Sequence, residues 1–284
     1  MDGDGEDGWF DSLRNLMPSP LRVVTKNMQA ETGTASYGQG VGSDRVLVRL
    51  DGRRASYVPL GSGEPLVCVA GGPGLPGSLL GDLGGLDRGW TLIRPDWRGA
   101  GDSDPPADGR HGVQEYAADL ERFREAIGLE RMDLLGHSFG GLVAASYAAA
   151  HPDRVRRLIL DGIPNSLEKE RIAGLELPVH FARWDAHGQA FAGALSEAWY
   201  WPAIRWFLDN EWASTDPTVA LSHVAAPTLV VTGELDVTCG QQCATSLAAA
   251  CGDATVAVIE GAGHFTAFEE PEGYRSRVEQ FLTA

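Results

Sequence analysis

Short apolar runs alternate with amphipathic segments along this chain from about residue 44, and this alternation restricts its fold more than any other feature. Runs rich in β-branched residues are typical of strands buried on both faces, whereas apolar residues three and four positions apart are typical of helices. The expected strands are RVLVRL, RASYVPL, PLVCVA, WTLIRPD, MDLLG, VRRLILDG, PTLVVTGELD and TVAVIEGAG. The expected helices are residues 113–129, FGGLVAASYAAA and PEGYRSRVEQFL. Strands that alternate with helices predict an α/β protein with a mostly parallel, doubly wound sheet, whose ligand site lies at the carboxyl ends of the strands.

Length and charge limit the partners of the chain. Its 284 residues are enough for one large α/β domain or two small ones. The 23 basic and 39 acidic residues give a net charge of −16, so neither nucleic acid nor an anionic membrane surface is an expected partner. The acidic start MDGDGEDGWF is unlike a secretory signal, and nowhere do enough uncharged apolar residues run together to cross a membrane. We therefore expect a soluble, cytoplasmic protein that acts on a small molecule, and a homo-oligomer is compatible with the sequence.

The alternation stops between about residues 164 and 225, a stretch that holds five of the eight tryptophans. The stretch is interpreted as two or three helices, which predicts a helical cap inserted into the α/β core. Aromatic residues of such a cap attach it to the core or line an apolar pocket, and Trp184, Trp199 and Trp206 are the expected pocket residues. The predicted organisation is an N-terminal extension over residues 1–43 with one short amphipathic helix, a core formed by 44–163 and 226–284, and a cap over 164–225.

Residues 132–143, MDLLGHSFGGLV, place one serine between glycines two positions away on either side. This G-x-S-x-G sequence, with Ser138 at its centre, lies between a predicted strand and a predicted helix. A sharp strand-to-helix turn exposes the serine hydroxyl, and small flanking residues keep other side chains from colliding with the turn. The N-terminus of the following helix adds partial positive charge where an oxyanion forms. We therefore predict that Ser138 is a catalytic nucleophile rather than a serine at an ordinary helix start.

A serine nucleophile needs a base to take its proton. Among the seven histidines, His264 in EGAGHF follows the last predicted strand, so it lies at the same sheet edge as Ser138. The neighbouring His137 is expected to point away from the nucleophile and to brace the turn. The remaining five fall in predicted loops, helix ends or the cap, where structural or solvated roles are commoner. His264 is therefore the predicted general base.

The base in turn needs a carboxylate that orients it. Asp236 ends the run VVTGELD at the carboxyl end of a strand and precedes His264, in the order Ser, acid, His. Asp161 in LILDG ends the preceding strand and is its rival, and Glu234 is a weaker candidate. We favour Asp236, because its turn directs a carboxylate toward the histidine loop.

The glycine-rich segment AGGPG over residues 70–74 follows a predicted strand, where a second oxyanion donor is expected. Glycines allow the backbone to approach a substrate, so the N–H groups of Gly72 and Phe139 are the predicted oxyanion hole. A plain Gly/Pro turn is the alternative interpretation. The segment DWRGAGDSD is expected to form a loop near the same edge, with structural roles for Asp96 and Arg98.

Four cysteines are too few for a disulfide scaffold in a chain of this length. Cys239, Cys243 and Cys251 lie close together in the sequence, but they contain no C-x-x-C pair and have no obvious fourth ligand nearby. We expect them and Cys68 to be thiols that serve as small apolar residues. The predicted site requires neither a metal nor an organic cofactor.

Together these segments resemble the α/β-hydrolase superfamily from about residue 44 to the end of the chain. Gly-Gly-Pro-Gly, Asp-x-Arg-Gly-x-Gly-x-Ser, the serine turn, the late aspartate and the late histidine follow the order of that family. The resemblance implies an α/β-hydrolase fold with a cap and acyl transfer through Ser138, His264 and Asp236. The first three segments also resemble the proline iminopeptidase branch. Ala70 stands where that branch usually has histidine, and the serine turn reads Gly-His-Ser-Phe-Gly where that branch usually has Gly-Gly-Ser-Trp-Gly. That branch holds the amine of its substrate with cap carboxylates, for which Glu197 or Glu211 could serve, but neither matches a motif.

The predicted function is therefore a serine hydrolase that cleaves an ester, thioester or amide of a small, largely apolar substrate. The alternatives are a proline iminopeptidase-like aminopeptidase and a non-hydrolytic biosynthetic enzyme, such as a cyclase, dehydratase or lyase, on the same scaffold. A receptor that only binds its ligand is disfavoured by the full set of candidate catalytic residues.

Overall fold

The computed structural model describes residues 45–163, 177–212 and 214–284 of the chain. The chain divides into two compact units, Met1–Ser36 and Tyr37–Ala284, and every described residue belongs to the second. The predicted N-terminal extension and its short helix, over residues 1–43, lie outside the described residues, as does the first part of the predicted cap. The boundaries of core and cap therefore stay predictions.

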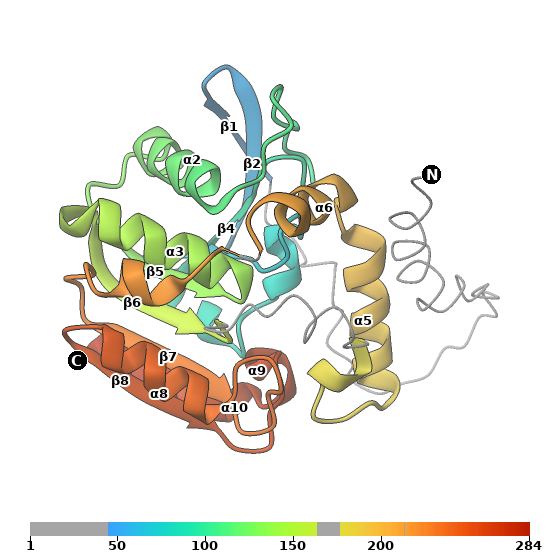
Figure 1. The fold of residues 1–284 in the computed structure, drawn as a ribbon, viewed down its shortest axis with the longest axis vertical. Coiled ribbons are helices and arrows are strands. Elements are labelled where there is room, and N and C mark those ends of the chain that lie inside the picture. Colours follow the sequence, from blue (N-terminus) through green and yellow to red (C-terminus); the bar gives the residue numbers. More distant parts are fainter. Residues whose placement is uncertain (1–44, 164–176, 213) are drawn as a thin grey trace, which may run out of the picture. The chain divides into compact units, whose positions relative to one another are not determined.

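An eight-stranded sheet organises the described part of the chain (Figure 1). Its strands are β1 (Val46–Leu50), β2 (Arg53–Gly61), β3 (Glu64–Val69), β4 (Trp90–Asp96), β5 (Met132–His137), β6 (Val155–Asp161), β7 (Thr228–Gly233) and β8 (Ala254–Ile259). They lie in the order β1-β2-β4-β3-β5-β6-β7-β8. Strand β2 pairs antiparallel with β1 and β4, whereas every other neighbouring pair is parallel. The predicted mostly parallel α/β sheet is confirmed.

Helices connect the parallel strands or, in the case of the last two, follow the final strand. They are α2 (Val113–Ala126), α3 (Phe139–Ala150), α5 (Ala186–Ala198), α6 (Trp201–Asn210), α7 (Pro217–Leu221), α8 (Gln241–Ala250), α9 (Thr266–Glu269) and α10 (Pro271–Thr283). Short 3₁₀ turns lie at η1 (Gly77–Leu80), η2 (Leu86–Arg88), η3 (Pro152–Arg154) and η4 (Leu177–His180). Helix α8 is not among the helices expected from the sequence. Only Ala244 and Leu247 of its ten residues are buried, so its sequence has no clear stripe of large apolar residues that would indicate an amphipathic helix.

Neighbouring residues of the parallel strands serve two different cores. Val67 and Leu134 pack in one cluster with residues of α2, α3, α7 and α8. Leu66 and Leu135, one position away, pack in a second cluster with Tyr274 and other residues of α10. Because side chains alternate between the two faces of a strand, both faces of this sheet are covered. This double burial explains why the strands read as continuous apolar runs.

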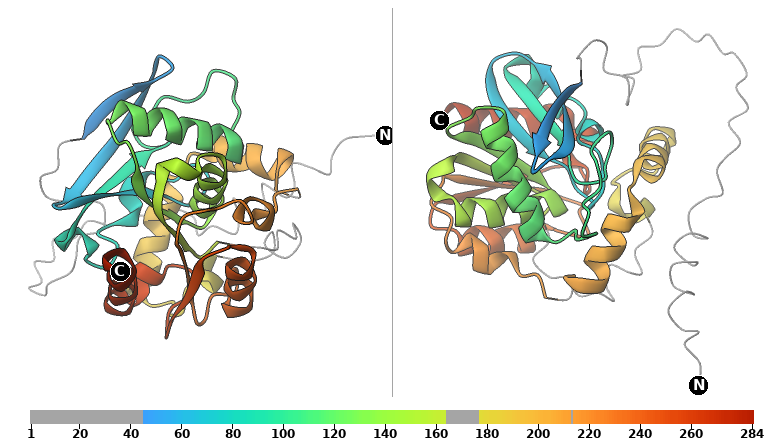
Figure 2. Two further views of the ribbon diagram at one scale, coloured as in Figure 1. Left: turned by 90° about the vertical axis from the view of Figure 1, so that its left-hand side faces the viewer. Right: turned by 90° about the horizontal axis from the view of Figure 1, so that it is seen from above.

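The segment between β6 and β7 carries the helices that the sequence places in a cap. Helices α5 and α6, yellow to orange, lie on one side of the sheet in Figure 1 and in the right-hand view of Figure 2. Phe191 and Leu195 of α5 form a small apolar cluster with Leu75, which follows β3. The insertion therefore packs its apolar face over a loop at the carboxyl edge of the sheet.

A buried ion pair fixes the loop that follows β4 to helix α2. Asp119 of α2, which is 1% exposed, pairs with Arg98 at 2.8 Å and with Arg53 at 2.7 Å. Arg98 also donates to the carbonyl oxygens of Arg110, at 2.8 Å, and Glu115, at 3.2 Å. A single guanidinium therefore holds one loop, one helix and one carboxylate together, as the structural role predicted for Arg98 requires.

Removal of the Asp119 charge is expected to destabilise the fold strongly. The substitution Asp119→Asn leaves the buried Arg98 without a counter-ion, which typically costs roughly 3 to 5 kcal/mol of unfolding free energy. The matched control is Asp209→Asn, because Asp209 is exposed and lies 4.0 Å from Arg205, where such a change stays within about 0.5 kcal/mol. Urea unfolding of both variants measures the difference, and equal effects would contradict this account of the loop.

Candidate active site

Ser138 occupies a strained turn between β5 and α3. Its backbone dihedrals are φ 53 and ψ −122, a region that residues with a β-carbon rarely adopt. Two backbone hydrogen bonds hold the turn: the Ser138 N–H donates to the Asp161 carbonyl at 2.8 Å, and the Ser138 carbonyl accepts from Gly141 at 2.9 Å. The first of these ties the end of β5 to the end of β6. The surrounding structure therefore enforces a conformation that the local sequence disfavours.

Both glycines of the G-x-S-x-G sequence are sterically required. A β-carbon on Gly136 would overlap the carbonyl oxygen of Gly140, and one on Gly140 would overlap the carbonyl oxygen of Val69. In each case the obstacle is backbone, which cannot rotate away. Strand β5, the start of α3 and the end of β3 can approach this closely only without side chains between them. This close approach of three backbone segments explains why the G-x-S-x-G sequence has glycine at both of these positions.

His264 and Asp236 form a buried hydrogen-bonded pair. The His264 Nδ1 lies 3.0 Å from the Asp236 Oδ2, and the two residues are 6% and 5% exposed. The other carboxylate oxygen, Oδ1, accepts from the N–H groups of Thr238 at 2.8 Å and Cys239 at 3.1 Å. The turn after β7 therefore fixes the Asp236 carboxylate. The carboxylate in turn orients the imidazole of His264 through Nδ1, so Nε2 takes no part in the hydrogen bond with Asp236.

The electrostatics of this pair favour a charged aspartate and a basic histidine. Burial opposes ionisation of Asp236, but the charge of His264 and the hydrogen bonds to Asp236 outweigh it and bring its pKa down to about 2. Burial by itself lowers the pKa of His264, yet the adjacent Asp236 carboxylate outweighs this effect and raises that pKa above its usual value. A raised pKa increases the capacity of the imidazole to accept a proton.

The His264 ring lies beside the Ser138 turn. A β-carbon built on Gly162 would come within 3.1 Å of the His264 Cε1, and Gly162 directly follows Asp161, whose carbonyl accepts from Ser138. In the part of the chain that the structure describes, the Ser138 hydroxyl has no hydrogen bond to the ring. Contacts of this kind are often long in enzymes without substrate and tighten in the Michaelis complex.

The rival carboxylate, Asp161, has a different partner. It is 1% exposed, and both of its oxygens lie 2.9 Å from the hydroxyl of Thr266, the first residue of α9. Burial outweighs this hydrogen bond and raises the pKa of Asp161 to about 7. Glu234, the weaker candidate, accepts from the N–H of Gly261 at 2.9 Å in an exposed position. The structure thus pairs the His264 ring with Asp236, not with Asp161 or Glu234.

Two further histidines surround His264. The His137 Nε2 lies 3.1 Å from the His264 carbonyl oxygen, and since a carbonyl only accepts, this nitrogen carries the proton. Burial lowers the pKa of His137 to about 4, which keeps the ring neutral. His180 of η4 accepts the His264 N–H at its carbonyl, at 2.8 Å, and its Nδ1 lies 2.9 Å from the Thr238 hydroxyl.

These contacts extend the sequence interpretation. His137 is predicted to brace the serine turn, and the structure shows that its ring also contacts the backbone of the His264 loop. His180 had no individual role in the sequence analysis, because it stands in the insertion, far from any motif. It ties the insertion to both the histidine loop and the turn that carries Asp236.

The residues predicted for the oxyanion hole belong to two segments that adjoin Ser138, the start of α3 and the turn after β3. Phe139 is the first residue of α3, where backbone N–H groups have no acceptor within the helix. Gly72 has a φ of 120, which requires glycine. A β-carbon on the adjacent Gly71 would lie 3.2 Å from the Ser138 Cβ, so the turn after β3 lies next to the serine.

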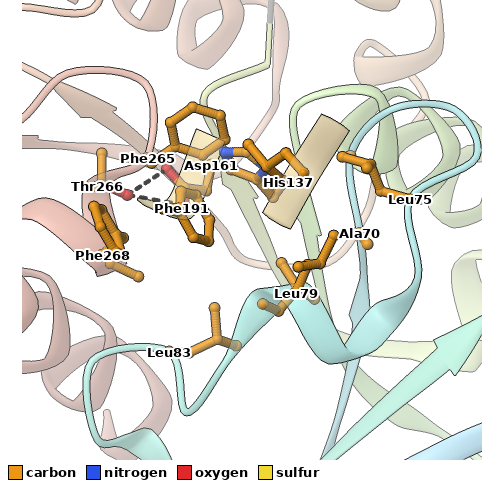
Figure 3. Close-up of a pocket in the computed structure, with 14 residues that line it drawn as sticks. Ala70, Leu75, Leu79, Leu83, His137, Asp161, Phe191, Phe265, Thr266 and Phe268 are labelled. Carbon is orange, nitrogen blue, oxygen red and sulfur yellow. Dashed lines mark hydrogen bonds between the residues drawn. The ribbon is translucent and has the colours of Figure 1, made fainter. Parts of the chain in front are cut away.

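A small apolar pocket opens beside this turn (Figure 3). Its volume is about 50 Å³, about a third of an engineered cavity of ~150 Å³ that binds benzene. Figure 3 shows Phe191, Phe265 and Phe268 toward one side, and Leu79 and Leu83 toward the other. The full lining is Ala70, Gly71, Leu75, Leu79, Leu80, Leu83, His137, Asp161, Phe191, Leu195, Phe265, Thr266, Ala267 and Phe268.

The three tryptophans predicted for the pocket are not among the residues that line it. Trp184 is 41% exposed and contacts Phe181. The indole N–H of Trp199 donates to the carbonyl of Pro73 at 2.7 Å, which attaches the insertion to the turn after β3. Trp206 lies half-buried on α6. Phenylalanines and leucines, rather than the predicted tryptophans, form most of the pocket lining.

The cap carboxylates considered for an amine site also lie elsewhere. The Glu211 Oε2 accepts from the N–H of Val113 at 2.9 Å, so Glu211 satisfies a donor in the first turn of α2. Glu197 is exposed on α5. Neither side chain lines the pocket.

The described helices include none with the length and apolar character needed to cross a bilayer. Two family models match the sequence: one described as alpha/beta hydrolase fold over residues 64–193, and one described as TAP-like protein over residues 200–284. These two matches together extend from β3 to the C-terminus and include Ser138, Asp236 and His264.

Curated relatives and solved structures agree with these models. The chain is 30% identical over 257 residues to a 2-hydroxymuconate semialdehyde hydrolase of Pseudomonas putida, a match that covers 81% of this chain and 91% of the relative. It is 33% identical over 117 residues to a proline iminopeptidase of Xylella fastidiosa (strain 9a5c), over 40% and 37% of the two chains. An esterase from Exiguobacterium antarcticum has the same fold, with a TM-score of 0.72, 22% identity, and coverage of 84% of this chain and 99% of that one. The chain therefore belongs to the α/β-hydrolase superfamily and is an enzyme of the hydrolase type.

Proposed function

We propose that this enzyme is a serine hydrolase that cleaves an ester, thioester or amide of a small, largely apolar substrate. Ser138 is the nucleophile, His264 the general base and Asp236 the carboxylate that orients it. The N–H groups of Gly72 and Phe139 form the oxyanion hole. The observation that carries this proposal is the buried 3.0 Å hydrogen bond between His264 and Asp236 beside the strained serine turn.

In the proposed reaction the Ser138 hydroxyl attacks the carbonyl carbon while the His264 Nε2 takes its proton. The two N–H groups stabilise the oxyanion of the tetrahedral intermediate. His264 then donates the proton to the leaving group, which departs and leaves an acyl-enzyme. Water attacks the acyl group with His264 again as base, and His264 then returns this proton to the Ser138 oxygen as the acid product leaves. The charged Asp236 stabilises the imidazolium that forms in each step.

The pocket supports an apolar group on the substrate. Its lining is dominated by leucine and phenylalanine, and it borders the serine turn through Gly71 and His137. A cavity of about 50 Å³ favours a short apolar substituent over a long chain. We infer that this pocket receives an apolar substituent next to the scissile carbonyl.

An aminopeptidase of the proline iminopeptidase type has less support. Such an enzyme needs a free carboxylate near the substrate amine. Glu211 is engaged with the start of α2, and Glu197 is exposed away from the pocket lining. The hydrolysis of a substrate without an amine is therefore favoured.

Ser138 is expected to react covalently with a fluorophosphonate probe. The probe should label the wild-type protein at Ser138 and should leave Ser138→Ala unlabelled, because the variant lacks the hydroxyl that is proposed to attack the phosphorus atom. Mass spectrometry of the labelled peptide measures the site, and a panel of p-nitrophenyl esters with short and long acyl chains measures turnover. Absence of labelling at Ser138 in folded protein would overturn the nucleophile assignment.

The two candidate acids are expected to respond differently to an isosteric change. Asp236→Asn removes the charge that orients His264 and is expected to lower the labelling rate at Ser138 by roughly 10³ to 10⁴, as in other triads. Asp161→Asn is the matched control, because it alters a buried carboxyl next to the site that bonds to Thr266, and we expect a change of less than about tenfold. The opposite ranking of the two variants would show that Asp161 is the acid.

The reactivity of Ser138 is expected to rise with pH as His264 loses its proton. Because Asp236 raises the pKa of His264 above 6.5, the midpoint of the profile lies above that value in the wild type. Asp236 itself, with a pKa of about 2, stays ionised throughout this range. The substitution Asp236→Asn removes the charge that raises the pKa of His264, whereas burial still lowers that pKa. The midpoint of the pH profile of the remaining Ser138 reactivity is therefore expected to move to lower pH. Labelling rates between pH 5 and 9 test this, and a midpoint that moves up in Asp236→Asn would refute it.

A further inference from the structure

Two cysteine thiols lie almost within bonding distance next to the turn that carries Asp236. The Sγ atoms of Cys239 and Cys243 are 3.1 Å apart, whereas a disulfide bond is about 2.05 Å long. Both sulfur atoms also approach the carbonyl oxygen of Ile163. The shared acceptor keeps the two thiols on the same side of the first turn of α8.

The two thiols differ in their access to solvent. Cys239, between β7 and α8, is completely buried, and its hydrogen bond with Cys243 together with burial raises its pKa far above the usual value. Cys243, the third residue of α8, is partly exposed. Cys243 is therefore the more accessible of the two residues to a small oxidant, and the Cys239 sulfur lies 3.1 Å from the Cys243 sulfur.

Cys239 is part of the backbone that holds the candidate catalytic acid. Its N–H donates to the Asp236 Oδ1 at 3.1 Å, and its carbonyl oxygen accepts from the Thr232 hydroxyl. A displacement of Cys239 toward α8 therefore acts directly on one of the hydrogen bonds that fix the Asp236 carboxylate. The dithiol and the His264–Asp236 pair share this short turn.

We propose that Cys239 and Cys243 form a reversible redox site, in which oxidation by a hydroperoxide closes a disulfide and slows the reaction at Ser138. The cross-link rests only on the geometry of the two thiols. The effect on the reaction rests on the proposed function, because it acts through Asp236 and His264.

The chemistry balances with the hydroperoxide as the only oxidant. The Cys243 sulfur attacks the peroxide oxygen, the O–O bond breaks, and Cys243 becomes a sulfenic acid while water or an alcohol leaves. The Cys239 sulfur then attacks the Cys243 sulfur, the S–O bond breaks, and the departing hydroxide takes the Cys239 proton to give water. Two thiols lose two electrons and two protons. A dithiol reductant restores them by exchange.

Closure of the disulfide requires the two sulfur atoms to move together by about 1 Å. The buried Cys239 then loses its contact with the Ile163 carbonyl, and its N–H shifts relative to Asp236. Since Asp236 orients His264, we expect at least a fivefold loss of the fluorophosphonate labelling rate at Ser138, recovered on reduction.

The experiment uses the full chain with hydrogen peroxide as oxidant and Cys251→Ser as the background. Trypsin cleaves after Arg205 and Arg275, so residues 206–275 form one peptide that then contains only Cys239 and Cys243. We expect this peptide to lose 2 Da on oxidation and to regain the mass with dithiothreitol. The added substitution Cys243→Ser is expected to abolish both the mass change and the loss of labelling.

Three results would overturn the proposal. They are the absence of a 2 Da loss, oxygen additions on Cys243 alone, and a disulfide that leaves the labelling rate unchanged. A failure of the proposed function gives a different result, because Ser138 then remains unlabelled even in the reduced protein, while the mass change still reports the disulfide.

Discussion

Close backbone approach at the Ser138 turn is the constraint on which the rest of the site depends. Strand β3, strand β5 and the start of α3 meet where Gly136 and Gly140 leave no room for a side chain. This contact brings the oxyanion candidates, the serine and the carboxyl ends of the central strands to one place. The cost is a non-glycine residue at positive φ, typically about 1 to 3 kcal/mol, which the two apolar cores on the sheet faces offset.

Three carboxyl groups are buried to a similar degree, but their partners give them different properties. Asp119 is neutralised by arginines and holds a loop. Asp236 faces an imidazole and two backbone N–H groups, so it stays charged. Asp161 accepts from the Thr266 hydroxyl, but burial outweighs this hydrogen bond and raises its pKa to about 7. The same chemical group is thus structural, orienting or nearly neutral according to the partners that the fold supplies.

The insertion contributes more than a cover for the pocket. His180 connects it to the His264 backbone and to Thr238, and Trp199 connects it to the turn after β3. Movement of the insertion therefore acts at once on the His264 loop, on the turn that carries Asp236 and on the turn after β3. The turn that carries Asp236 ends at Cys239, one of the two neighbouring thiols. This short segment therefore contacts the insertion through Thr238 and holds the Asp236 carboxylate through Cys239.

Patterns in the sequence predicted all eight strands, the helices α2, α3 and α10, the serine turn and the pairing of a late aspartate with a late histidine. These features follow from local periodicity, turn chemistry and the common edge of parallel strands. Tertiary structure decided what depends on contacts between distant segments. It placed phenylalanines rather than Trp184, Trp199 and Trp206 around the pocket, assigned Glu211 to the start of α2, and brought His180 to His264. Such choices depend on side-chain packing across elements, and periodicity along one segment carries no information about the segment it will face.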